Sequence, residues 1–368
     1  MKNYLNFETE VKELETKLNS LKDPYNNEGI SEVNTKEIEI LEEKVNDKLK
    51  KIYSGLNPLQ RTQVARHEER PKAKYFIENL FTDFISLSGN KFYGEDKSII
   101  AGFCKFEDKS ILVIGQEKGE NLEERLERNF GMVTPGGYNR SIKLMELANK
   151  FNIPIITFID TPGASPTVSS EEEGQSEAIA KCIETSVNLK VPNIALILGE
   201  GGSGGAVALA TSNKVLMLEN AVYSVISPEG CASILWKDPK KTLEAATAMK
   251  MTAQDLFNRK IIDEIIEEPI GGAHRNREST LENIRIAIRK NLENFTDLTE
   301  DEIIQQRKNK FLQIGRNKGF SSKLDMQHGL SFKKNNLNIF LDKVLQKKQL
   351  LTFSLVLILA ILVLIYFL

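Results

Sequence analysis

The chain has 368 residues, 41% of them hydrophobic, so it can bury a large core and does not have the composition of a disordered protein. Its 49 lysines and arginines nearly balance its 51 aspartates and glutamates, which leaves no net field to attract an acidic polymer, so no nucleic-acid partner is expected. Three cysteines lie far apart without a C-x-x-C pair, which supports neither a disulfide framework nor a metal site in this chain and fits a reducing, cytosolic setting: Cys104, Cys182 and Cys231.

Two amphipathic helices are expected near the start of the chain, where no apolar run indicates a signal peptide. Apolar residues recur at intervals of three and four in two segments: Phe7, Val11, Leu14, Leu18 and Leu21, then Ile38, Leu41, Val45, Leu49 and Ile52. The turn-rich residues 23–27 separate these segments. The pattern predicts a helical hairpin packed on the main domain, within an N-terminal helical region at 1–90.

Alternating strands and helices are expected from about Lys91 to residue 272. The first two strands form a pair joined by a turn at residues 107–109. The expected strands are Ser98–Phe106, Ser110–Gln116, Ile153–Ile159, Asn193–Leu198 and Lys214–Leu218, and the expected helices are Tyr138–Phe151, Glu171–Leu189 and one beginning at Ser203. This order predicts an α/β fold with right-handed crossovers and a largely parallel sheet. Ligand sites in such folds lie at the carboxyl ends of the strands.

The C-terminal part of the chain divides into three segments. Helices are expected at Leu281–Phe295 and Glu300–Ile314, within residues 273–314, and a basic linker follows at 315–349. Residues 350–368 carry no charge, and as a helix they would rise about 28 Å, close to the roughly 30 Å of a bilayer core. The sequence therefore predicts a transmembrane tail, and three lysines before it place the rest of the chain in the cytoplasm: Lys343, Lys347 and Lys348.

Two glycine-containing loops directly follow apolar strands: Asp160–Ala164 (DTPGA) and Gly199–Ala206 (GEGGSGGA). Glycine lets backbone N–H groups approach a ligand closely, and the start of the following helix adds positive potential. We expect the N–H groups of Gly204 and Gly205 to form an oxyanion hole, worth roughly 3–4 kcal/mol per donor. The residues expected to contact the substrate around it are Gly201, Gly202, Pro162, Gly163 and Ala164.

Other interpretations of the second loop remain open. Ser203 lies in a G-x-S-x-G pattern typical of serine hydrolases, but as the N-cap of a helix it would have an ordinary structural role. A catalytic triad needs a base, and all three histidines are expected outside the α/β core: His67, His274 and His328. Dinucleotide binding would use G-x-G-x-x-G at 199–204 with Glu219, and tight packing of glycine is a purely structural alternative.

Six longer stretches resemble the α subunit of bacterial acetyl-CoA carboxylase carboxyltransferase, in order and from about residue 3 to Gly315. They are 128–132 (RNFGM), 155–164 (IITFIDTPGA), 174–180 (GQSEAIA), 199–206 (GEGGSGGA), 223–236 (YSVISPEGCASILW) and 269–275 (PIGGAHR). The resemblance implies a crotonase-type spiral of ββα units. It also implies transfer of a carboxyl group from carboxybiotin to acetyl-CoA, which gives malonyl-CoA for fatty-acid synthesis.

The same resemblance implies several partners. In this family the site lies between an α and a zinc-bearing β subunit of an α2β2 assembly, and the β subunit holds the thioester enolate. Gly204 and Gly205 of this chain would polarise the ureido oxygen of biotin, which a biotin carboxyl carrier protein presents after biotin carboxylase has loaded it. The freed biotin nitrogen would take the acetyl proton, so the chain would need no general base.

One loop departs from the family pattern. After Ala164 the family continues with YPGVGAEERG, whereas residues 165–174 here read SPTVSSEEEG, and residues 134–139 read TPGGYN instead of APEGYR. These changes leave open a weaker substrate fit, a divergent paralogue or an inactive scaffold. A membrane-tethered Clp-type serine peptidase that uses Ser203 is the further alternative.

Overall fold

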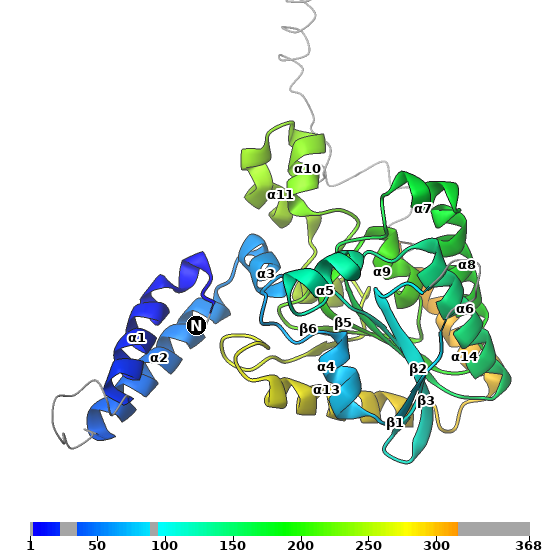
Figure 1. Ribbon diagram of the computed structural model, residues 1–368, viewed down its shortest axis with the longest axis horizontal. Coiled ribbons are helices and arrows are strands. Elements are labelled where there is room, and N and C mark those ends of the chain that lie inside the picture. The colour runs from blue at the N-terminus through cyan, green and yellow to red at the C-terminus, as the bar shows by residue number, and fades with distance from the viewer. Residues whose placement is uncertain (1–2, 23–34, 89–94, 316–368) are drawn as a thin grey trace, which may run out of the picture. The chain divides into compact units, whose positions relative to one another are not determined.

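The computed structural model describes residues 3–22, 35–88 and 95–315 (Figure 1). All of these lie within one compact unit, Met1–Phe320, and the second unit, Ser321–Leu368, lies outside the described residues. The predicted transmembrane tail at 350–368 and nearly all of the predicted linker therefore fall outside the described part of the chain. Within the described part, no helix is both long and apolar enough to cross a membrane.

The N-terminal helices form the predicted hairpin, because α1 (Thr9–Lys22) packs along α2 (Thr35–Ser54) (Figure 1). Their facing apolar stripes are buried and include Val11, Leu18, Leu41, Val45 and Leu49. Arg275 joins this hairpin to the main domain, since its guanidinium lies 3.1 Å from a Glu8 carboxylate oxygen and 3.0 Å from one of Glu15.

Three elements between the hairpin and the first predicted strand were not located individually within the predicted helical region at 1–90: α3 (Pro58–Ala65), α4 (Ala73–Leu80) and β1 (Thr82–Ser86). Strand β1 pairs antiparallel with β2, so part of the 1–90 range that was expected to be helical belongs to the sheet. All five residues of β1 are exposed, and it lies at the edge of the sheet. An exposed edge strand has no buried face, and its sequence therefore lacks the alternation that reveals a strand.

The sheet has the order β1-β2-β3-β4-β5-β6-β8, and β7 also pairs with β5. Pairing is antiparallel from β1 to β3 and parallel from β3 onward, which confirms the predicted strand pair and the largely parallel sheet. The remaining strands are β2 (Ile99–Phe106), β3 (Lys109–Gln116), β4 (Ile155–Thr161), β5 (Asn193–Gly202), β6 (Lys214–Leu218), β7 (Val222–Ser224) and β8 (Glu264–Ile266).

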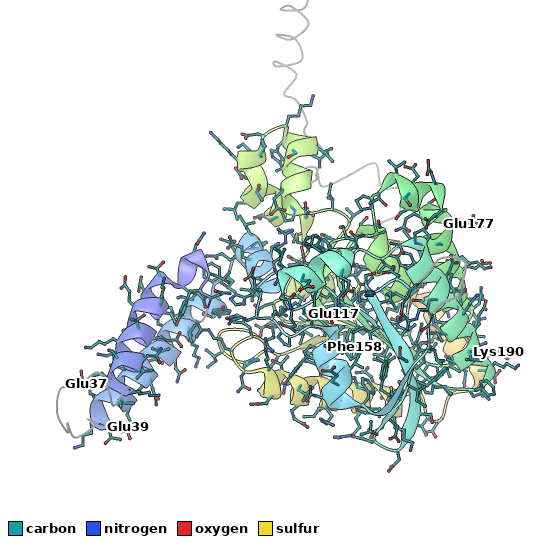
Figure 2. All side chains as sticks on the ribbon, in the orientation of Figure 1. Glu37, Glu39, Glu117, Phe158, Glu177 and Lys190 are labelled. Atoms are coloured by element: carbon teal, nitrogen blue, oxygen red, sulfur yellow. The ribbon has the colours of Figure 1, made fainter. Side chains whose placement is uncertain are left out.

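Helices cover both faces of the sheet, which explains why every residue of β4 is buried. Phe158, labelled in Figure 2, points toward α4, where its ring centroid lies 6.0 Å from that of Phe76. The preceding Thr157 hydroxyl donates to the Leu209 carbonyl at 3.0 Å, on α9 (Ser203–Ala210). Since successive residues of a strand point to opposite faces, α4 and α9 lie on opposite sides of β4.

The other helices complete these layers. On the α9 side, α6 packs against α8, which contacts α9, while α13 contacts α4 and β8. Fully buried Arg307 of α14 donates to the Leu189 and Val191 carbonyls at 2.6 and 2.8 Å and ties the C-terminal helix to this core. The bounds are α5 (Leu122–Glu127), α6 (Pro135–Lys150), α7 (Val168–Glu172), α8 (Gln175–Asn188), α10 (Pro228–Cys231), α11 (Thr242–Met249), α12 (Ala253–Asn258), α13 (Arg277–Glu293) and α14 (Glu300–Gln313).

Several predicted elements are shifted by a few residues at their ends, and two near the glycine loops differ in a way that bears on the site. The helix expected at Glu171–Leu189 is two helices, α7 and α8, because Gly174 between them has a φ of 85° that a helix does not allow. The strand expected at Asn193–Leu198 continues as β5 to Gly202, so half of the glycine stretch is strand rather than loop.

Candidate active site

The two predicted glycine loops emerge side by side from the parallel strands β4 and β5. The pairing changes register between them, because Ile159 pairs with Ile197 whereas Thr161 pairs with Gly201. Over this interval β4 advances two positions and β5 advances four, so β5 contains a bulge. The bulge brings the glycine stretch opposite the start of the DTPGA loop, where Gly201 pairs with Thr161.

The backbones of the two loops lie in close contact, and this contact explains why two of the positions are glycine. A Cβ atom at Gly202 would lie 2.1 Å from the Pro162 carbonyl oxygen, and one at Gly205 would lie 2.5 Å from the Ala164 nitrogen. A Cβ at Gly204 would meet only the Ile179 side chain, at 3.5 Å or more. All seven predicted site residues are thereby gathered in one region: Gly201, Gly202, Gly204, Gly205, Pro162, Gly163 and Ala164.

Helix α9 begins at Ser203 and takes Gly202 as its N-cap, so the predicted capping role of Ser203 is wrong. Ser203 has a φ of 51°, in the left-handed region, because the chain turns sharply there from strand to helix. The N–H groups of the first turn have no partner within the helix, and the helix dipole makes this end positive. Gly204 is half-buried and Gly205 is buried at this end.

The two described histidines stack on each other, and His67 also forms hydrogen bonds with the backbone. The rings of His67 and His274 stack with centroids 3.9 Å apart. The Glu69 N–H donates to His67 Nδ1 at 3.2 Å, which assigns the His67 proton to Nε2, where it reaches the Asn3 carbonyl at 2.9 Å. Burial, together with the His67 ring, lowers the pKa of His274 to about 2. Neither imidazole is therefore arranged as a base for Ser203, and His328 lies outside the described residues.

A cavity of about 220 Å³ opens beside the two loops. Asp160 and Pro162 of the first loop line it together with Glu200 of the second. The basic residues of its wall come from segments that the sequence analysis did not single out: Arg66, Arg70, Lys72, Lys118 and Arg125. Of these, Lys118 had a usable signal, because it follows an apolar strand just as the two predicted loops do.

Charged side chains in this cavity are paired rather than free. Lys118 Nζ lies 2.8 Å from Asp160 Oδ1 and 2.9 Å from Glu200 Oε2, and Arg66 Nε lies 2.6 Å from Glu200 Oε1. Burial alone would lower the pKa of Lys118, but the two carboxylates outweigh it and raise that pKa. Burial would raise the pKa of Glu200, but Lys118 and Arg66 outweigh it and lower that pKa. Both shifts favour the charged forms of Lys118 and Glu200.

The loop that departs from the family pattern is ordered by short polar side chains. The Ser170 hydroxyl donates to the Ser165 hydroxyl at 2.8 Å, and Thr167 accepts from the Ser170 N–H at 3.2 Å as the N-cap of α7. The Ser165 N–H donates to the Val133 carbonyl at 3.0 Å. Ser165, Thr167 and Ser170 thus hold this loop in place at positions where the family pattern has a tyrosine, a glycine and an alanine.

Comparison with known proteins identifies the family of the chain. Residues 4–315 match the family described as "Acetyl co-enzyme A carboxylase carboxyltransferase-like". The chain is 62% identical over 348 residues to the acetyl-coenzyme A carboxylase carboxyl transferase subunit alpha of Pelagibacter ubique (strain HTCC1062), covering 95% of each protein. It is 48% identical over 320 residues to the protein of that name from Rhodopseudomonas palustris (strain BisA53), covering 87% of this chain and 99% of the relative.

Among solved structures, a chain of the Pseudomonas malonate decarboxylase hetero-tetramer in complex with coenzyme A has a similar fold. The TM-score is 0.51 at 13% identity, covering 63% of this chain and 90% of that chain. At this identity the likeness concerns the fold alone, which is the crotonase-like α/β fold.

Proposed function

This chain belongs to the family of acetyl-CoA carboxylase carboxyltransferase α subunits, and on that premise we propose how its two glycine loops take part in carboxyl transfer. The enzyme is a carboxyltransferase. The observation that carries the proposal is the meeting of the DTPGA loop with the N-terminus of α9 at Gly202 and Gly205. The reaction transfers a carboxyl group from carboxybiotin to acetyl-CoA and gives malonyl-CoA.

The N–H groups of Gly204 and Gly205 hold the ureido oxygen of biotin, on which negative charge builds as the carboxyl group leaves. The unpartnered N–H groups and positive dipole of the first turn of α9 fit an oxygen of this kind. The wall around the ureido oxygen consists of Gly201, Gly202 and the Pro162–Ala164 segment. Biotin itself supplies the carboxyl group and then a ring nitrogen that takes the acetyl proton, so the chain provides binding and orientation and no general base.

The partners follow from this division of roles. The relatives are named as alpha subunits, which supports a β subunit as the partner. In our proposal this β subunit bears zinc and completes the site within an α2β2 assembly. The β subunit holds the thioester of acetyl-CoA, and a biotin carboxyl carrier protein, loaded by biotin carboxylase, brings the carboxybiotin. The assembly works in the cytoplasm. The direct test is formation of malonyl-CoA from carboxybiotin and acetyl-CoA by the purified complex with β, and an inactive complex would favour the scaffold alternative.

Replacing Ser203 by glycine should leave carboxyl transfer within about threefold of the wild-type rate, because the hydroxyl has no part in holding the ureido oxygen. Glycine is the better test than alanine, since the φ of 51° at this position strains an alanine but not a glycine. The measurement is kcat for malonyl-CoA formation by the complex, with peptide hydrolysis assayed in parallel. Hydrolysis that disappears in Ser203→Gly would instead identify a Clp-type serine peptidase.

Residues 350–368 anchor the enzyme to the inner membrane in our proposal, with the catalytic part on the cytoplasmic side. The support is the uncharged, Leu-, Ile- and Val-rich sequence and the lysines that precede it. Full-length protein should sediment with membranes through a high-salt wash, whereas a chain that ends at Gln349 should stay in the supernatant with equal activity. Full-length protein that remains in the soluble fraction would refute the anchor.

A further inference from the structure

The bulge of β5 is held by the carboxylate of Asp160. Its Oδ1 accepts the Glu200 N–H at 2.9 Å. A Cβ atom at Gly199 would lie 2.7 Å from the same oxygen and 2.9 Å from the Ala65 carbonyl, so the carboxylate occupies the place of a side chain there. The position of the Asp160 side-chain oxygen therefore helps to fix the path of the extra residues of β5.

Glu200 is the residue at which β5 changes its neighbour. Before the bulge, residues Ile194–Ile197 pair with β6, and after it Glu200–Gly202 pair with β7. Helix α9 starts immediately after this second segment, at Ser203. The placement of Glu200 thus determines where the glycine N–H groups lie relative to the DTPGA loop.

Lys118 joins the two carboxylates that control this placement. Its ammonium lies 2.8 Å from Asp160 Oδ1, the oxygen that accepts the Glu200 N–H, and 2.9 Å from Glu200 Oε2. The backbone next to Lys118 is fixed as well, because the buried Glu117 carboxylate (Figure 2) accepts the N–H groups of Lys74 at 2.7 Å and Gly119 at 2.8 Å. Without the ammonium, the buried Asp160 carboxylate would lose this cation and would face the partly buried Glu200 carboxylate, which would keep only its ion pair with Arg66.

We infer that Lys118 is a positioning residue for carboxyl transfer: its ammonium links Asp160 to Glu200 and so fixes the start of α9 against the Pro162–Ala164 segment. This inference rests on the proposed function of the glycine N–H groups. Lys118 acts through the bulge and not by contact with the reacting atoms, so its loss should lower kcat and leave the KM values for both substrates nearly unchanged.

The test compares Lys118→Met, which removes the charge, with Lys118→Arg, which keeps it, in the complex with β. We expect kcat per folded complex to fall about 10–100-fold in Lys118→Met, as for other small displacements of catalytic groups, with KM within about threefold. Lys118→Arg should recover at least about a third of the wild-type kcat. Lys105→Met is the matched control, since it breaks an exposed ion pair with Asp83 on β1 and should have wild-type kcat.

A Lys118→Met/Asp160→Asn double variant guards against a single variant that does not fold. It removes one charge of each sign and keeps an amide oxygen for the Glu200 N–H, so it should fold and still lose about tenfold in kcat. Wild-type kcat in folded Lys118→Met or in the double variant would overturn the inference, as would a large rise in KM at unchanged kcat. A wild-type complex without transfer activity would instead refute the proposed function.

Discussion

Replacing Gly204 by proline should lower kcat for carboxyl transfer by about 10²–10³, the loss typical of removing one oxyanion donor. Proline has no N–H, and Gly204 is the second residue of α9, where the N–H has no helical partner and proline is tolerated. The substitution therefore deletes the proposed donor without breaking a hydrogen bond of the fold. KM for acetyl-CoA should change little, because the donor acts on the biotin side.

The design of this experiment follows from the backbone at the neighbouring positions. A residue before proline is conformationally restricted, so the change is best made in the Ser203→Gly background, with Ser203→Gly as the reference. Gly204→Ala is the matched control, since it keeps the N–H and its Cβ would meet only Ile179 at 3.5 Å. Gly205 is a poor position for the test, because a Cβ there would strike the backbone at Ala164. A folded Gly204→Pro complex with near-normal kcat would exclude the donor role.

The elements that the sequence predicted well are those with strong periodicity and two buried faces. The run Ile153–Ile159 is apolar except for Thr157 because β4 has helices on both sides, and Lys214–Leu218 was located to the residue for the same reason. The meeting of the two glycine loops was also foreseeable, since both follow neighbouring parallel strands whose carboxyl ends lie at one edge of the sheet. Strand β1 was missed because none of its residues is buried.

The ion-pair network of the site could not be predicted from any local pattern. Its charged side chains come from four separate segments: Arg66, Lys118, Asp160 and Glu200. They meet only because β3, β4 and β5 end at one edge of the sheet and α3 ends nearby. The bulge that brings Glu200 to Asp160 likewise has no signature in the sequence, because it depends on pairing between strands about forty residues apart. The register between strands that are distant in the sequence is fixed by packing, and local sequence patterns carry no information about that packing.

Long-range strand pairing also explains why the prediction of Ser203 as the N-cap of its helix was wrong. A serine before an apolar helix is a common N-cap, and local sequence favours that assignment. The observed strand continues to Gly202, so the cap moves one residue earlier and Ser203 takes a positive φ. This shift leaves the Gly204 N–H in the first turn of α9, at the end that the proposed reaction uses.

The most direct measurement is the rate of malonyl-CoA formation from carboxybiotin and acetyl-CoA by this chain alone, by the β subunit alone and by the two mixed. The proposed site holds donors for one oxyanion, and the proposal assigns a second set, for the thioester, to β. We therefore expect the chain alone to be slower than the mixture by more than about 10³-fold, with activity rising in proportion to added β until the two are equimolar. Transfer by this chain alone at the rate of the mixture would contradict the shared site.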